Sequence, residues 1–533
     1  MAPGRSDGVS GPGWTRRPSH VARTVGMSLP LRTRSPARRA ESNHHMDRLS
    51  GLDASFLYLE TPAQLMHVCG VIVLDPSTMP GGYSFEALRD HLEAAVRDVS
   101  TFTRKVRPVP LGLDHPIWVQ DRHFAIDRHV HRLALPAPGG YRELTELTSH
   151  LAGLPLDRSR PLWEMWVIEG YRTESGAEGV VVFSKMHHAT VDGVSGSNLI
   201  SHLCSLEPDA APMALGEPES TGREPGQGEL LGRAVLSNLA RPLNAVRLVT
   251  PSVQLVTRTI GRARAGTAMA APFSAPRTSF NGTITGHRAI ALADLELEDV
   301  RQLKNATGTT VNDVVLAVAG GALRSYLDDR GELPATSLLA TVPVSVREQS
   351  RHATGANKVS ALFTKLGTDF EDPLERLRDL AERNRFAKEH HAAISADSLQ
   401  DWAEFAAPRT FGLAMRAYAG LRLPERHPVV HNLVISNVPG PPVPLYFMGA
   451  RIEALYPLGP VFHGAGLNIT VMSNHGRIHV GIIACRESLP DVDDLVRRFP
   501  AELATLKAAV VADRLADGVV TPVKRTRKRA STR

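Results

Sequence analysis

The chain has 533 residues, of which 42% are hydrophobic and 22% charged, the composition of an ordinary globular protein. This length suggests about two to four domains and is enough for two sizeable cores. No apolar run reaches the roughly 18 residues that a membrane-spanning helix needs. Three widely spaced cysteines, Cys69, Cys204 and Cys485, offer neither a metal motif nor a disulfide framework. They indicate a reducing compartment and are interpreted as small buried hydrophobic residues.

The positive charge lies at the two ends of the chain. Residues 1–45 carry a net charge of +6 and residues 522–533 another +6, so the residues between them carry −6. A nucleic-acid-binding domain is expected to carry its basic stripe on the folded body, so nucleic acid is not an expected partner. We predict a disordered basic leader over 1–45, ahead of a functional start at Met46, and a disordered basic tail over 516–533.

The first predicted elements are a strand over 66–74 and a helix over 84–97, where apolar residues recur at helical spacing. A short apolar run at 179–183 predicts a strand that is buried on both faces. Helical spacing resumes after Gly193 and is expected to end before Pro208, because the residue before a proline disfavours the helical conformation.

A linker and a basic amphipathic segment follow. Residues 207–231 are rich in Pro, Gly and Glu and predict a linker. Residues 232–265 place six arginines among Leu and Val, which is typical of a helix lying on a membrane surface. A helix packed on the second domain with a solvated basic face fits the same pattern, and the sequence leaves both interpretations open.

The second half repeats the same mixture of strands and helices. Thr310 and Asp313 form a variant capping box ahead of one helix, and the residues at 474–477 indicate a hairpin turn. The predicted strands are 288–293, 337–346, 429–436, 467–472 and 478–484, and the predicted helices are 311–327, 374–394 and 490–515. Alternating strands and helices predict an α/β protein with two lobes, here 46–206 and 281–515, joined by the linker region 207–280.

The strongest chemical signal is the stretch His187-His188-Ala189-Thr190-Val191-Asp192-Gly193. It follows the buried strand, and a strand end can present a side chain rigidly. A histidine titrates near neutral pH, so it can take a proton from an alcohol and later return it to a thiolate. Two alternatives remain. His188 is an ordinary core histidine, or His187, His188 and Asp192 are metal ligands. A metal site needs a third ligand at a recognisable spacing, and no such residue is found.

Several motifs in chain order make the sequence similar to a known family. The stretch His187–Gly193 resembles the HHxxxDG motif of the bacterial wax ester synthase/diacylglycerol acyltransferase family, within the CoA-dependent acyltransferase superfamily. Other segments resemble further motifs of that family: 46–62 its N-terminus, 161–163 PLW, 312–313 ND, and 343–347 and 436–441 two more signatures. The resemblance covers about residues 46–510, and an ordered set of motifs is far more specific than any one of them.

The resemblance implies an α/β fold of two chloramphenicol-acetyltransferase-like lobes with mixed sheets and an active-site tunnel between them. It also implies that His188 is the catalytic base and that acyl-CoA is a co-substrate, with no permanently bound cofactor and no metal. The acceptor is then diacylglycerol, giving triacylglycerol, or a fatty alcohol, giving a wax ester. There are two alternatives: an acyltransferase that acts on another alcohol, and a non-catalytic protein that binds lipid droplets. The expected place is cytoplasmic, peripheral on the inner membrane surface or on lipid droplets.

Four residues are expected to support His188. His187 either shapes the pocket or is a packed neighbour, and Gly193 permits a sharp turn. By the resemblance, Asp192 is structural and pairs with an arginine, for which Arg347 is the candidate. Asn312 carries an amide donor at a predicted helix N-terminus, which suits an oxyanion, but capping of that helix explains it as well. The residues that bind CoA are not assigned.

Overall fold

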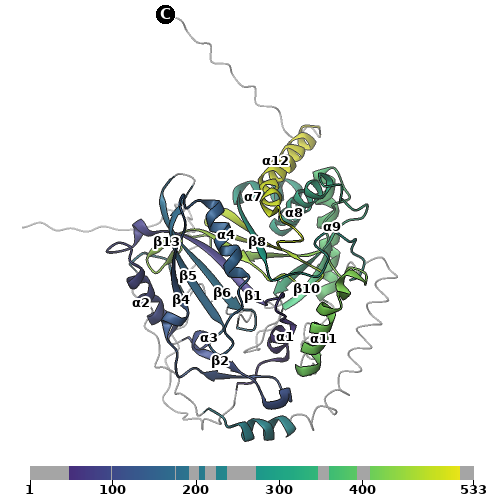
Figure 1. Ribbon diagram of the computed structural model, residues 1–533. Coiled ribbons are helices and arrows are strands. Elements are labelled where there is room, and N and C mark those ends of the chain that lie inside the picture. The colour runs from purple at the N-terminus through teal and green to yellow at the C-terminus, as the bar shows by residue number, and fades with distance from the viewer. Residues whose placement is uncertain are drawn as a thin grey trace, which may run out of the picture. The chain divides into compact units, whose positions relative to one another are not determined.

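The computed structural model describes residues 47–97, 99–173, 176–190, 203–209, 224–236, 272–345, 359–392 and 408–516. Two mixed β-sheets and the helices that cover them make up this part of the chain (Figure 1). The predicted α/β class with two sheet-containing lobes is therefore confirmed. The predicted leader, the tail and most of the basic amphipathic segment lie outside the described residues.

The first sheet carries the histidine motif at the end of one of its central strands. Its strand order is β4-β5-β6-β1-β13-β12-β7. The strands are β1 (His67–Asp75), β4 (Val130–Ala134), β5 (Trp163–Arg172), β6 (Glu178–His187), β7 (Cys204–Ser205), β12 (Tyr446–Phe447) and β13 (Ala450–Leu458). The helices before and between them are α1 (Gly51–Leu59), α2 (Phe85–Val96), α3 (Ser100–Thr103) and α4 (Tyr141–Ala152), and β2 (Arg104–Arg107) and β3 (Ile117–Gln120) form a separate hairpin.

The second sheet has the order β10-β9-β11-β14-β15-β8. Its strands are β8 (Arg288–Glu296), β9 (Leu339–Ser345), β10 (Val359–Lys365), β11 (Leu433–Pro439), β14 (Leu467–Asn474) and β15 (Arg477–Cys485). The helices of this half are α7 (Leu297–Thr307), α8 (Val311–Asp328), α9 (Pro373–Ala392), α11 (Pro408–Gly420) and α12 (Val492–Ala516).

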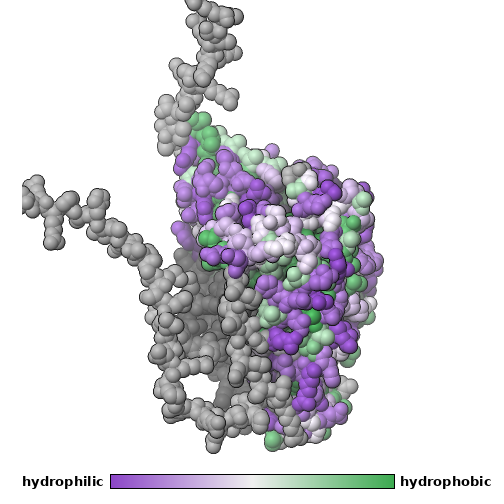
Figure 2. Space-filling model, turned by 90° about the vertical axis from the view of Figure 1, so that its left-hand side faces the viewer, coloured by the Kyte–Doolittle hydropathy of each residue, from purple (hydrophilic) through white to green (hydrophobic). Residues whose placement is uncertain are grey.

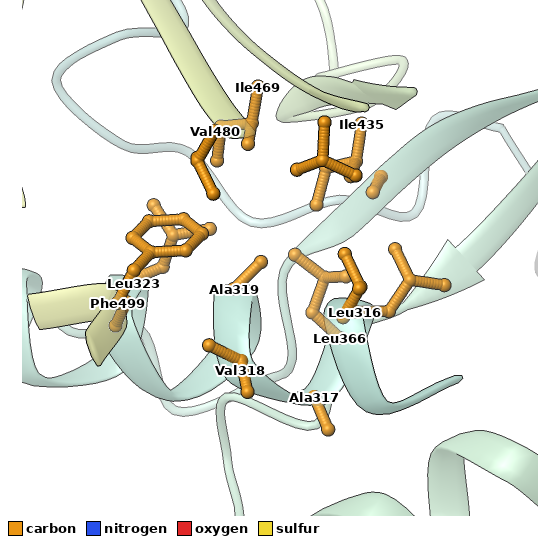
Figure 3. Packing of buried hydrophobic residues seen from close by; sticks show 14 of the residues in the cluster. Leu316, Ala317, Val318, Ala319, Leu323, Leu366, Ile435, Ile469, Val480 and Phe499 are labelled. Carbon is orange, nitrogen blue, oxygen red and sulfur yellow. The ribbon is translucent and has the colours of Figure 1, made fainter. Parts of the chain in front are cut away.

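The largest core lies between the second sheet and the helices on one of its faces. Side chains of α8 such as Leu316 and Leu323 face Ile435 of β11 and Val480 of β15, and Phe499 of α12 closes the cluster (Figure 3). All of these side chains are almost fully buried. Because α8 is buried nearly all round from Asp313 to Leu323, its N-terminal turn is held rigidly against the sheet.

Each half of the sequence contributes one element that packs on the sheet of the other half. Strand β13 comes from the second half, yet it pairs antiparallel with β1 in the first sheet, with Cys69 opposite Leu458. Helix α4 comes from the first half and lies along β8, the edge strand of the second sheet: the Leu292 amide donates to the Tyr141 hydroxyl, and the Ile290 amide to the Ser149 hydroxyl. Covering an edge strand blocks unwanted pairing, and these two connections fix the lobes to each other.

Most predicted elements are confirmed, and two boundaries were wrong. The strand predicted at 429–436 is β11, which starts only at Leu433 because Val429 instead bridges to Ala275. Residues 227–236 are helical, so the linker predicted over 207–231 ends earlier. The helix predicted after Gly193 ends before Pro208 as expected, since residue 203 is helical and residues 204–205 pair with β12 as β7; residues 191–202 lie outside the described part.

The capping box and two of the three cysteines behave as predicted. Cys69 and Cys485 are buried and Cys204 is half-buried, and all three are free thiols. Burial raises the pKa of both Cys69 and Cys204 to about 12, so neither is a nucleophile at neutral pH. Thr310 accepts from the Asp313 amide, and the Asp313 carboxylate accepts from the Thr310 amide. No helix among the described residues is long and apolar enough to cross a membrane.

Candidate active site

The histidine pair sits where β6 leaves the first sheet. The His187 amide donates to the Leu162 carbonyl at 3.0 Å, and the His188 amide donates to the Met66 carbonyl at 2.7 Å. The hydroxyl of Thr190 then closes a turn by donating to the His187 carbonyl at 2.7 Å. Two backbone segments that are distant in sequence, together with one bond inside the turn, therefore fix it, and His188 projects from a rigid support.

The ring of His188 packs against an aromatic ring. Its centroid lies 4.1 Å from that of Phe56 on α1, with the two planes tilted by 32°. Burial, together with the neighbouring His187, lowers the pKa of His188 to about 4. At neutral pH the His188 imidazole is therefore unprotonated and able to accept a proton, as a general base must be.

His187 has a different environment and one defined tautomer. Its side chain is 1% exposed. The Ala189 amide donates to Nδ1 of His187 at 3.0 Å, so Nδ1 is an acceptor and the ring proton belongs on Nε2. Nε2 lies 3.1 Å from Oε1 of Glu60, the residue that follows α1. His187 is thus fixed by a hydrogen bond at Nδ1 and faces a carboxylate at Nε2, which fits a packed neighbour of His188.

Glu60 is the centre of this arrangement. Its Oε1 accepts from the Met66 amide at 3.0 Å, beside the carbonyl that holds the His188 backbone, and lies 3.6 Å from Nε2 of His67. Its Oε2 accepts from Arg158. Burial by itself raises the pKa of Glu60, but the nearby His187 and the charge and hydrogen bond of Arg158 outweigh it and lower this pKa to about 2. The carboxylate is therefore charged at any physiological pH.

His67 completes the buried group without adding charge. It pairs with His187 in the β1–β6 register, and their ring centroids are 6.1 Å apart. Burial lowers the pKa of His67 to about 3, so it is neutral beside the Glu60 carboxylate. No group of His, Cys, Asp and Glu side chains in the described part of the chain is arranged to hold a metal ion.

Asn312 lies in the other half of the protein, and it does not cap its helix. Thr310 and Asp313 fill that role, so the capping interpretation of Asn312 was wrong. The Asn437 amide donates to Oδ1 of Asn312 at 3.4 Å, which brings the ND segment and the 436–441 segment together. Asp313 is structural in a second way, because Asn384 of α9 donates to its carboxylate at 2.8 Å.

Several predicted site residues remain without a structural test. Asp192, Gly193 and Arg347 lie outside the described residues. A groove of about 640 Å³ lies between α4 and the start of β8, lined by residues such as Arg142 and Arg486, but neither His187 nor His188 lines it. The expected tunnel therefore stays a prediction.

Sequence reasoning missed Phe56 and Glu60. Both lie in the segment 46–62, which was matched to the family's N-terminus without a role for any residue in it. A carboxylate at the end of an apolar helix has no local pattern that points to chemistry. Its partner His187 is 127 positions further along the chain, and only the pairing of β1 with β6 brings the two together.

Solved structures define the class of fold. A wax ester synthase/diacylglycerol acyltransferase from Marinobacter aquaeolei matches over 87% of this chain and 100% of its own, with a TM-score of 0.62 and 30% sequence identity. The first condensation domain of the CDA synthetase matches over 87% of this chain and 96% of its own, with a TM-score of 0.51 and 15% identity. The second match shows a shared fold alone: two lobes of the acyltransferase and condensation-domain type.

Sequence comparisons then place the chain in its family. Residues 49–315 match the model of the wax ester synthase/diacylglycerol acyltransferase catalytic domain, and residues 355–507 match that of the WS/DGAT C-terminal domain. A putative diacylglycerol O-acyltransferase of Mycobacterium tuberculosis is 47% identical over 486 residues, covering 90% of this chain and 93% of its own. A second, probable one from that organism is 34% identical, covering 87% and 100%. The chain belongs to the wax ester synthase/diacylglycerol acyltransferase family.

Proposed function

We propose that this enzyme transfers a long-chain fatty acyl group from acyl-CoA to the hydroxyl of diacylglycerol, forming triacylglycerol, and that fatty alcohols serve as alternative acceptors. The acyltransferase class follows from family membership, and the related proteins of M. tuberculosis carry the name diacylglycerol O-acyltransferase. The observation that carries the proposal for this chain is the position of His188, which is fixed at a strand end and packed on Phe56; its lowered pKa agrees with a role as base.

The chemistry assigned to His188 is a direct transfer. The imidazole takes the proton of the acceptor hydroxyl as its oxygen attacks the thioester carbonyl carbon. The tetrahedral intermediate then collapses, the carbon–sulfur bond breaks, and the protonated imidazole returns the proton to the CoA thiolate. No acyl-enzyme is needed, which agrees with the buried, high-pKa thiol of Cys69.

The negative charge on the intermediate needs a donor. We assign this role to the side-chain amide of Asn312. Its oxygen accepts from Asn437, so its NH₂ group is not used in that contact and can donate to an oxyanion. We further propose that Asp192 and Gly193 shape the loop after His188. Peripheral association with the inner membrane surface or a lipid droplet is part of the same proposal, because the acceptor is a lipid.

The test is a transfer assay with the purified chain. Radiolabelled palmitoyl-CoA is mixed with diacylglycerol, with hexadecanol, or with a short water-soluble alcohol, and the lipid products are separated. Labelled triacylglycerol that is formed by the wild type and not by His188→Ala supports the proposal. A wild type that bound lipid but produced no ester with any acceptor would instead favour a non-catalytic lipid-binding protein.

A further inference from the structure

Helix α11 has apolar residues on both of its faces. Its inner side contacts α1: a Cβ atom on Gly412 would lie 3.7 Å from the Tyr58 carbonyl, and Phe411 and Met415 are partly buried. The outer side carries the stripe Leu413, Ala417 and Leu421, at i, i+4 and i+8. Leu413 is 65% exposed and Leu421 58%. Single exposed leucines are normal, but a stripe of them along one helix face indicates a surface with a partner.

An exposed aromatic residue extends this surface. Phe273 is 56% exposed, and its backbone is held at a φ of 67° by the bond from its amide to the Val430 carbonyl. Its ring lies edge-on to His427, 6.3 Å away, and Tyr418 of α11 is hydrogen-bonded to the same histidine at 2.6 Å. A non-glycine residue in the left-handed region is uncommon, so the fold holds this phenylalanine outward beside the end of α11.

The same stretch is basic, whereas the body of the protein is acidic. Residues 408–426 contain four arginines and one acidic residue, Glu425, a net charge of +3. Arg416, Arg422 and Arg426 are exposed, and Glu425 pairs with Arg422 at 2.8 Å. Figure 2 views the protein from the left-hand side of Figure 1. By contrast with α11, hydrophilic residues dominate the coloured part of that face, and hydrophobic ones are scattered over it.

We infer that the outer face of α11, with Phe273, is the surface by which this protein docks on a lipid surface with anionic headgroups. Leucines and a phenylalanine flanked by arginines suit the boundary between headgroups and acyl chains, because the apolar side chains enter and the guanidinium groups pair with phosphates. Each arginine near such a surface contributes about fivefold in affinity. This inference rests on the proposed function, in which the acceptor is a lipid.

The position of α11 places the proposed docking surface close to His188. Helix α1 lies against α11 and also carries Phe56, whose ring packs on His188. The docking surface is therefore separated from the reacting histidine by one helix. A lipid acceptor that left the bilayer on this side would therefore enter the protein close to the proposed active site.

The test uses the full chain and vesicle sedimentation. Vesicles of phosphatidylcholine, with and without phosphatidylglycerol, are mixed with the wild type, with Leu413→Ser/Leu421→Ser and with Arg416→Gln/Arg426→Gln. The matched control is Val511→Ser/Leu515→Ser, since Val511 and Leu515 are 51% and 42% exposed on α12, far from α11 in Figure 1. Melting temperatures are measured for all variants, and transfer is measured with detergent-dispersed and vesicle-embedded diacylglycerol.

We expect the leucine variant to bind both vesicle types at least roughly tenfold more weakly, because each leucine contributes about that much when fully buried. The arginine variant should lose binding only to anionic vesicles. Both should keep their melting temperature and their activity in detergent. Unchanged sedimentation of the leucine variant overturns the inference. A large drop in its melting temperature with normal sedimentation also overturns it, because the chain itself then covers this face. So does a wild type that is a dimer and a leucine variant that is a monomer, because a second copy then covers this face. A wild type that sediments but transfers no acyl group refutes only the proposed function.

Discussion

Nε2 of His187 lies 3.1 Å from Oε1 of Glu60, and this contact joins the end of α1 to the end of β6. The same oxygen accepts from the Met66 amide, and the Met66 carbonyl holds the backbone of His188. One carboxylate therefore positions both histidines, one through its ring and the other through its backbone. Glu60 is a positioning residue, because it acts on the proposed base only through these neighbours.

Glu60→Gln is expected to lower kcat by between about ten- and a hundredfold, because a small displacement of a catalytic group is costly. The amide has only one oxygen, so it cannot accept from both Met66 and Arg158 as the two carboxylate oxygens do. Steady-state kinetics with acyl-CoA measure the effect, and Glu169→Gln is the control, since Glu169 pairs with Arg132 away from the histidines. A kcat that stayed at the wild-type value would show that Glu60 only supports the fold.

The same carboxylate makes stability depend on pH. The pKa of Glu60 is about 2 in the folded protein, against an ordinary value of 4.5. Its contribution is thus complete above pH 4.5 and is lost as the pH falls toward 2. Melting temperatures of the wild type and Glu60→Gln should differ most at pH 6 and converge as the pH is lowered. A constant gap between them would contradict this linkage.

The two histidines should respond differently to alanine. His188→Ala is expected to lower turnover by roughly 10²–10⁴-fold, the usual contribution of a positioned base, with little change in melting temperature. His187→Ala should cost about 1–3 kcal/mol of folding free energy, because it removes a buried partner of Glu60, and should leave more activity than His188→Ala. Turnover and thermal melts of both variants decide between them. The reverse ranking in turnover would make His187 the base.

Phe56 is expected to set the pH dependence of transfer. With the pKa of His188 at about 4, activity should be flat above about pH 6 and fall as the histidine becomes protonated near pH 4. Phe56→Ala admits water to the ring, so the acid limb should move up toward the ordinary value of 6.5. Phe56→Leu keeps water away from the ring and should shift the acid limb less. A profile of kcat/KM against pH measures both, and an unshifted limb in Phe56→Ala would contradict burial as the cause.

Asn312 and Asn437 are expected to act together. If the amide of Asn312 stabilises an oxyanion, Asn312→Ala should lower kcat by about 10²–10³-fold, and Asn437→Ala should have a smaller effect. The double variant should lose less than the product of the two single losses, since the residues are in contact. Losses that multiply would show that the 3.4 Å contact has no catalytic consequence.

The sequence by itself determined the local elements and the proposed base. The apolar run before His187 predicts a buried strand, Thr310 and Asp313 predict the start of α8, and the residues at 474–477 predict the turn between β14 and β15. In that turn His475 and Gly476 take positive φ values of 39° and 88°, as a tight hairpin turn requires. Such features depend on neighbours within a few residues, so a local pattern is enough to reveal them.

Only the tertiary structure decided which distant segments meet. No local pattern shows that β13 pairs with β1, that α4 covers the edge of β8, or that β11 begins at Leu433 because Val429 is already bridged to Ala275. The same holds for Phe56 and Glu60, whose contacts with His188 and His187 cross more than a hundred positions of sequence. Periodicity shows which face of an element is buried, but not what is buried against it. The surroundings that lower the pKa of His188, the proposed base, therefore became visible only once α1, β1 and β6 were packed together.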